Sequence, residues 1–139
     1  MTPEFVADSS VAIAWVVASL SIPETEELAE QLKAGAIFVV PVLWMFEVAN
    51  VLLILQRRQR IDQHQYQQGL SYLSDANPSV DGEGPRLAFS IIARLAKQHK
   101  LSIYDATYLE LALRRDLPLA SRDAALNKAA RAAGIRTLL

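Results

Sequence analysis

Short apolar runs alternate with longer amphipathic stretches along the whole chain, and the two kinds of run predict different elements. The short runs are β-branched or small, lie between turn residues, and are typical of strands buried on both faces. The predicted strands cover residues 5–7, 36–40, 79–80, 119–121 and 135–138.

The longer stretches place apolar residues three or four positions apart, which is the spacing of one helix face. Their ends carry the expected signals, such as Pro23 at one start and Gly35 or Gly134 just beyond a last turn. The predicted helices cover residues 11–18, 23–34, 42–58, 62–75, 86–100, 102–115 and 124–133.

Alternating strands and helices indicate an α/β fold with a parallel sheet and crossover helices. In such sheets, functional groups collect at the carboxyl ends of the strands. The chain has 139 residues, the length of one domain, and we predict a single domain over residues 1–139.

Composition narrows the chemistry more than it narrows the fold. Cysteine is absent, which excludes thiol catalysis and thiolate metal sites and fits a reducing cytoplasm. We expect a cytoplasmic protein without a signal peptide or a membrane span, because no apolar stretch reaches about 20 uninterrupted residues. The net charge of −1 excludes a polybasic tail but leaves room for a local basic patch.

Four carboxylates follow or interrupt apolar segments: Asp8, Glu47, Asp105 and Asp123. Three of them have an ordinary structural explanation. Asp8 and Asp123 stand at strand-to-helix junctions, where an acid caps a helix, and Asp105 completes a capping-box pattern with Ser102. Each such cap contributes about 1 kcal/mol.

Glu47 has no such explanation. It lies in a stretch, residues 41–55, that is apolar on nearly every side, so we expect the helix to be largely buried. A carboxylate there costs several kcal/mol unless it is paired or bound to a metal. Asn50 follows one turn later on the same face, able to donate to Glu47 or to a ligand.

We expect all four acids to converge on one rim of the sheet, at the carboxyl ends of its strands, because each lies just after a predicted strand or near a helix start. Carboxylates that close together repel one another, and a hard divalent cation with oxygen ligands, Mg²⁺ or Mn²⁺, would neutralise them. Nothing suggests zinc, since both histidines lie in polar surroundings.

A magnesium ion among carboxylates suits the hydrolysis of phosphodiesters, with one carboxylate orienting the attacking water. A nuclease also needs cations for the flanking phosphates. Arg122, beside Asp123 at the predicted rim, is the better candidate, and Arg86 is another. Other arginines stand at helix ends, where the helix dipole alone accounts for them. These are Arg57, Arg58, Arg114 and Arg115.

The acids stand in four short segments: FVADSS at residues 5–10, EVAN at 47–50, SIYDATYLELA at 102–112 and LPLASRD at 117–123. Their order and contexts resemble those of the PIN-domain family, specifically the VapC-type toxins of type II toxin–antitoxin modules. Each segment alone is a weak signal, but four in this order form a specific one. The resemblance spans essentially the whole chain.

The resemblance implies a three-layer α/β/α sandwich around a mostly parallel sheet. It also implies a metal-dependent endoribonuclease toxin that forms a homodimer, cuts structured RNA such as tRNA or rRNA, and is held inactive by a cognate antitoxin. Carried over by position, the acidic cluster is formed by Asp8, Glu47, Asp105 and Asp123. The supporting polar residues are Ser10, Asn50 and Ser121.

A second class of function remains open, a catalytically inactive PIN-like scaffold or another acidic-pocket binding module. A phospho-receiver would have clustered acids at its first strand, where this chain has Asp8 alone. A haloacid-dehalogenase-type phosphatase would have a second Asp two residues later, where this chain has Ser10. A degenerate PIN scaffold would typically lack one acid, and here all four are present.

Overall fold

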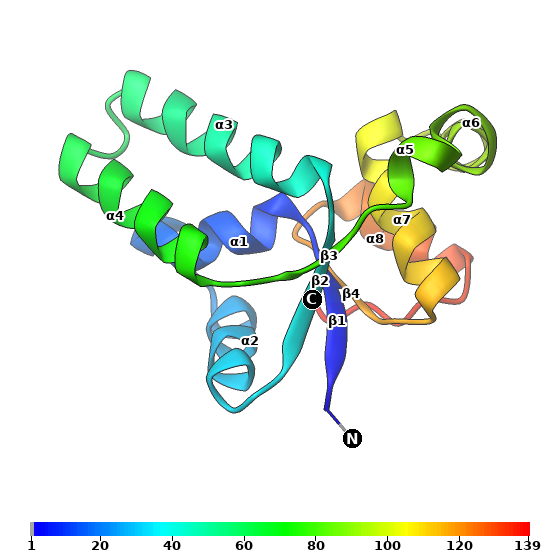
Figure 1. Cartoon of the computed structure of the whole chain (residues 1–139), viewed down its shortest axis with the longest axis horizontal. Helices are drawn as coiled ribbons and strands as arrows, with labels where there is room; N and C mark the ends of the chain where they lie inside the picture. Colours follow the sequence, from blue (N-terminus) through cyan, green and yellow to red (C-terminus); the bar gives the residue numbers. More distant parts are fainter. Residues whose placement is uncertain (1) are drawn as a thin grey trace.

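The centre of the molecule is a parallel sheet whose strand order reverses beside its first strand. The computed structural model describes residues 2–139, and within them four strands pair in the order β3-β2-β1-β4 (Figure 1). The strands are β1 (Glu4–Ala7), β2 (Ile37–Pro41), β3 (Ser79–Asp81) and β4 (Leu119–Ala120). All pairings are parallel, and β1 lies between β2 and β4, so the crevice for a ligand is expected at this reversal.

Helices cover both faces of this sheet, which gives three layers (Figure 1). On one side lie α1 (Ser9–Val16), α2 (Pro23–Lys33), α3 (Leu43–Arg57) and α4 (Gln63–Asp75), with a 3₁₀ turn, η1 (Ala18–Leu20), after α1. On the other side lie α5 (Gly84–Leu87), a π-helical turn η2 (Ala88–Ile92), α6 (Ala93–His99), α7 (Ile103–Arg115) and α8 (Ala124–Ala132). The predicted α/β/α architecture is therefore confirmed.

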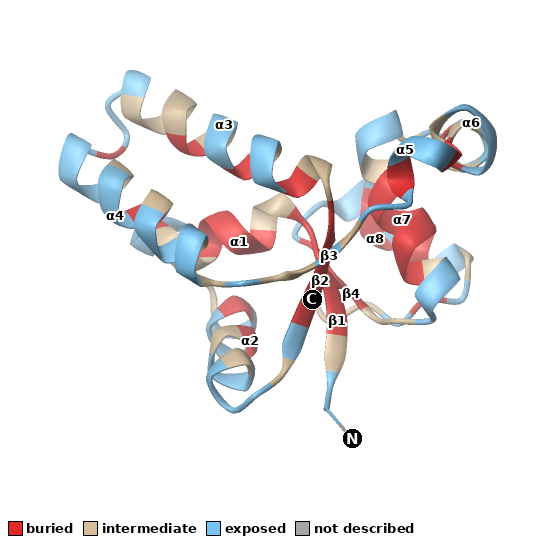
Figure 2. Ribbon diagram, in the orientation of Figure 1, coloured by how far each residue is buried: buried red, intermediate tan, exposed pale blue. Residues whose placement is uncertain are grey.

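The core lies between these layers, where strands and the inward faces of helices carry the buried side chains (Figure 2). Phe38 of β2 packs edge-to-face against Trp15 and Trp44, with ring centroids 5.3 and 5.6 Å apart. Burial of the strands on both faces explains why their sequences are continuous apolar runs rather than alternating ones.

The predicted strand at residues 135–138 is wrong. Only Thr137 forms an isolated parallel bridge, opposite Leu119. The N–H of Leu119 donates to the Arg136 carbonyl at 2.9 Å, and the N–H of Leu138 donates to the Leu119 carbonyl at 2.9 Å. Because β4 has only two residues, it offers too little backbone for a longer ladder.

The expectation that the helix carrying Glu47 is largely buried is also wrong. Its partners α1 and α4 cover one face, which holds Trp44, Val48 and Leu52. The opposite face exposes apolar side chains, and the Phe46 side chain is 73% exposed. One apolar face of α3 therefore belongs to the core, and the other is an apolar surface that the rest of this chain does not cover.

A network of charged side chains ties the end of α7 to the end of β3. The Arg114 guanidinium donates to both carboxylate oxygens of Asp81, at 3.0 and 2.8 Å, and its Nε donates to Glu110 at 2.8 Å. The hydrogen bonds from Arg114 hold the pKa of Asp81 below its usual value. Arg114 is thus a structural residue, as its place at a helix end predicted.

Replacing Arg114 by Met should destabilise the fold by about 3 kcal/mol, because it leaves the buried Glu110 carboxylate without a cation and leaves Asp81 only the more distant Arg115. Arg86→Met is the matched control, since the exposed Arg86–Glu83 pair contributes about 0–1 kcal/mol. Urea unfolding of both variants measures the difference. Equal losses would mean that the network does not hold α7 to β3.

Candidate functional site

Asp8 occupies the first position after β1 and is held by three hydrogen bonds. Its Oδ1 accepts from the Ser10 hydroxyl at 2.5 Å and from the Val11 N–H at 3.3 Å, and its Oδ2 accepts from the Ser121 hydroxyl at 2.5 Å. The residue caps α1 and is only 5% exposed. Asp8 therefore acts as a helix cap and, at the same time, is a buried carboxylate at the strand reversal.

Ser121 joins the ends of β1 and β4. Its hydroxyl donates to Asp8 and accepts from the Asp123 N–H at 2.9 Å. Its carbonyl accepts from the Asn127 side chain at 2.9 Å, which fixes the turn into α8. Asp123 is exposed and caps α8 by accepting from the Leu126 N–H at 2.8 Å. The Ser121 hydroxyl thus links the Asp8 carboxylate to the backbone N–H of Asp123, and the Asp123 carboxylate caps α8.

Asp105 lies in the first turn of α7. Its N–H donates to the Ser102 hydroxyl at 3.0 Å, which caps the helix. Within residues 2–139 the return bond of a capping box, from the Ser102 N–H to the Asp105 carboxylate, is not formed. The helix cap therefore does not require the Asp105 carboxylate.

Glu47, in the second turn of α3, has a partner that the sequence analysis did not identify. The buried Tyr108 hydroxyl donates to Glu47 Oε1 at 2.6 Å and so connects α3 to α7 across the top of the sheet. Burial, the bond to Glu47 and nearby acids raise the pKa of Tyr108, which keeps its hydroxyl protonated as a donor. The available signal was spacing, because Tyr108 follows Asp105 by three residues and shares its helix face.

Burial and mutual repulsion raise the pKa values of three of these acids. Burial is the largest cause for Asp8, Glu47 and Asp105. Asp105 adds repulsion at Asp8 and at Glu47, and Asp123 adds repulsion at Asp105. Among residues 2–139, no ion pair includes any of the four acids, so no protein cation offsets this charge.

The other predicted residues are brought to the site to different degrees. Ser10 bonds Asp8 and accepts from the Arg122 N–H at 2.9 Å, while the Arg122 guanidinium donates to the Leu20 carbonyl. Asn50 is exposed on α3, one turn from Glu47. Arg86 instead pairs with Glu83 in α5, and no hydrogen bond or ion pair of the described chain joins it to the four acids.

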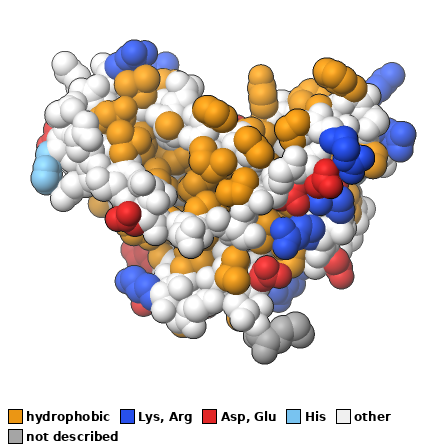
Figure 3. All heavy atoms as spheres, in the orientation of Figure 1, with side chains coloured by type: hydrophobic (Ala, Val, Ile, Leu, Met, Phe, Trp, Pro, Cys, Tyr) orange, Lys and Arg blue, Asp and Glu red, His pale blue; other side chains and the backbone are white. Residues whose placement is uncertain are grey.

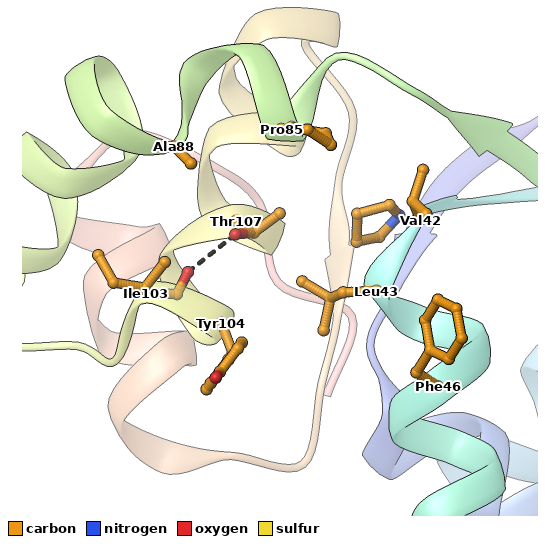
Figure 4. A pocket seen from close by; sticks show the side chains of 10 residues that line it. Val42, Leu43, Phe46, Pro85, Ala88, Ile103, Tyr104 and Thr107 are labelled. Atoms are coloured by element: carbon orange, nitrogen blue, oxygen red, sulfur yellow. Dashed lines mark hydrogen bonds between the residues drawn. The ribbon is translucent and has the colours of Figure 1, made fainter.

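An open hollow of about 680 Å³ lies beside Glu47. It is lined by Leu43, Phe46, Glu47, Asn50 and Tyr104. A second, almost wholly apolar pocket of about 290 Å³ adjoins it between α3, α5 and α7 and shares Leu43, Phe46 and Tyr104 (Figure 4). The acidic rim thus opens onto a surface that is mainly apolar.

The donors at the rim fit a hard divalent cation, because carboxylate and hydroxyl oxygens are the ligands that Mg²⁺ and Mn²⁺ prefer. In the described chain no three His, Asp or Glu side chains lie close enough to ligate one ion together. An ion bound at this rim would therefore have at most two of these carboxylates as direct ligands, and waters would complete its coordination.

The α/β/α fold thus holds one carboxylate directly after β1 and others on α3, on α7 and at the start of α8, none of them in an ion pair within residues 2–139, an arrangement that suits metal-assisted hydrolysis. The sequence profile of the PIN domain family matches residues 5–132, and the chain belongs to that family. PIN domains are in general metal-dependent nucleases.

A solved structure supports the fold independently. The crystal structure of PAE2754 from Pyrobaculum aerophilum is similar with a TM-score of 0.72 and 21% sequence identity, covering 99% of this chain and 91% of that chain. No curated protein matches the sequence. No helix within residues 2–139 has both the length and the apolarity to cross a membrane.

Asp105→Asn should raise the melting temperature of the metal-free protein at neutral pH, because it removes a desolvated, repelled charge but keeps the cap from Ser102. The raised pKa means that the ionised carboxylate destabilises the fold above that pKa. This penalty disappears as the pH falls toward the ordinary value of 3.8, so the advantage of the variant should disappear as well. Thermal unfolding in EDTA across this range measures it.

With added Mn²⁺ the wild type should have the higher melting temperature of the two, because the ion binds it more tightly than it binds Asp105→Asn. Asp62→Asn is the control, since Asp62 caps α4 and Asn caps equally well. If Asp105→Asn melted at a higher temperature than the wild type by the same amount at every pH, the charge of Asp105 would not be the cause of the difference.

Tyr108→Phe should destabilise the fold by about 1.5–3 kcal/mol, the typical contribution of a hydrogen bond to a charged group, because the ring stays and only the donor is lost. The pKa of Glu47 should rise further, since the Tyr108 hydroxyl lowers it. Urea unfolding and carboxyl NMR titration measure both effects. Tyr66→Phe on α4 is the control, and an unchanged Glu47 titration would contradict the expectation.

Proposed function

We propose that this protein is a metal-dependent endoribonuclease that acts as the toxin of a type II toxin–antitoxin pair. The observation that carries the proposal is the set of mutually repelling acids near the strand reversal, which form no ion pair with a cation of residues 2–139. Such a set is unfavourable for stability and suits a site that binds a divalent ion.

The residues that would hold Mg²⁺ or Mn²⁺ are Asp8, Glu47, Asp105 and Asp123, one or two of them directly and the others through water. The ion, when bound, supplies a nucleophilic water and neutralises charge on the phosphodiester. Ser10 and Ser121 fix the Asp8 carboxylate, which leaves it little freedom to turn away from the rim.

In this proposal Glu47 orients the attacking water or accepts its proton. Tyr108 occupies one of its oxygens, which leaves the other free for this role. Asn50 and Arg122 are exposed near the rim and are proposed to contact RNA. Arg86 is proposed as a more distant phosphate contact, since its exposed pair with Glu83 exchanges easily.

Uncovered apolar surface supports the proposed protein partners, a cognate antitoxin and a second copy of this chain. Figure 3 shows hydrophobic side chains on both sides of the notch at the top of the view, over the region of α3 and α4 and toward α5 and α6. On α3, Met45 is exposed. Apolar surface of this kind marks interaction sites.

Cleavage of purified tRNA and rRNA with Mg²⁺ tests the activity. Asp105→Asn should lower the rate at least about 100-fold, as expected for a group acting in proton transfer or in holding the ion. Asp123→Asn should also lower it while keeping the α8 cap. EDTA should abolish cleavage, and Asp62→Asn should cut normally.

In cells, the wild type should arrest growth and Asp105→Asn should not. Full RNA cleavage by both site variants would reject the site. A wild type that binds its partner but cuts no RNA would favour the alternative, a catalytically inactive PIN-like binding module.

A further inference from the structure

Two aromatic rings stand exposed at the edge of the site, one from each helix that supplies an acid. The Phe46 side chain on α3 is 73% exposed, and Tyr104 on α7 is 64% exposed. Figure 4 shows them on either side of Leu43. Each ring is next in sequence to a site acid, Glu47 or Asp105.

The hollow that these rings border is part of the acidic site rather than a separate groove. It is lined by Glu47 and Asn50 together with Leu43, Phe46 and Tyr104. At about 680 Å³ it lies within the range of small-ligand sites, about 300–1,000 Å³. Whatever occupies it lies directly beside the group placed to act on the reacting phosphodiester.

A nucleobase matches this lining. Its flat face stacks on Phe or Tyr rings, and its polar edge pairs with a side-chain amide such as that of Asn50, which both donates and accepts. A base within a duplex has no free face, so only an unpaired base in a loop, bulge or single strand can enter.

We propose that this hollow binds an unpaired nucleobase of the RNA next to the bond that is cut, stacked on Phe46 and Tyr104 and contacted at its edge by Asn50. The proposal rests on the ribonuclease function above and adds which residues of this chain would hold the base.

Binding of a single-stranded RNA carrying 2-aminopurine tests this directly. Asp105→Asn protein with Mg²⁺ serves as the parent, because it retains both rings and should not cut the RNA. Phe46→Ala and Tyr104→Ala should each raise the Kd about tenfold and lose the change in 2-aminopurine fluorescence. Tyr104→Phe should restore both, since a Phe ring also stacks.

Phe89→Ala is the matched control, because Phe89 is 99% exposed on η2 and lines neither pocket. It should leave the Kd unchanged. In the wild-type background the two ring variants should raise KM for single-stranded RNA far more than they lower kcat. Circular dichroism verifies that each variant is folded.

Equal Kd values for parent and ring variants would overturn the base site. So would a loss of affinity that only accompanies a change in oligomeric state by sedimentation, which would assign the rings to a second copy of the chain. If the wild type cuts RNA and ring variants bind normally, only the base site fails. If the wild type neither cuts nor binds RNA, the proposed function fails and the base site fails with it.

Discussion

The burial of the Asp8 carboxylate, which forms no ion pair within residues 2–139, is the constraint on which the rest of the site depends. Two hydroxyls and one backbone N–H hold it, and none of these donors cancels its charge. Hydrogen bonds to a carboxylate favour its ionised form, but for Asp8 desolvation outweighs them. The rim therefore keeps an excess of negative charge, and Asp105, Glu47 and Asp123 add to it rather than relieve it.

Topology explains why acids so far apart in the sequence share this rim. The chain builds β1, β2 and β3 outward in one direction and then returns to place β4 on the other side of β1. The carboxyl ends of β1 and β4 therefore become neighbours, which brings Asp8 beside Ser121 although 113 residues separate them. Burial of the apolar strands stabilises this pairing. The repulsion among the acids therefore does not prevent the chain from adopting the fold.

The sequence predicted the features that short segments determine by themselves, and it missed those that depend on contacts with other parts of the chain. Strands, helix starts and the four acids follow from periodicity, caps and the cost of burying Glu47. Whether residues 135–138 form a strand depends on the length of β4, the strand they would pair with. The sequence of residues 135–138 does not determine that length. Whether an apolar face of α3 is core or surface depends on what covers it, and the Tyr108 hydroxyl is a contact 61 residues away in the chain.

The structural interpretation of the acids is confirmed for Asp8 and Asp123, which cap helices, and the positions of the acids explain how a cluster of carboxylates at this rim is tolerated. Asp8 and Asp123 cap helices and Asp105 lies in a first turn, so each sits near the positive end of a helix dipole. Backbone N–H groups and dipoles thus offset part of the repulsion before any ion binds. Glu47 lies a turn deeper in its helix and lacks that compensation, which is why a donor from another helix, Tyr108, is required to hold it.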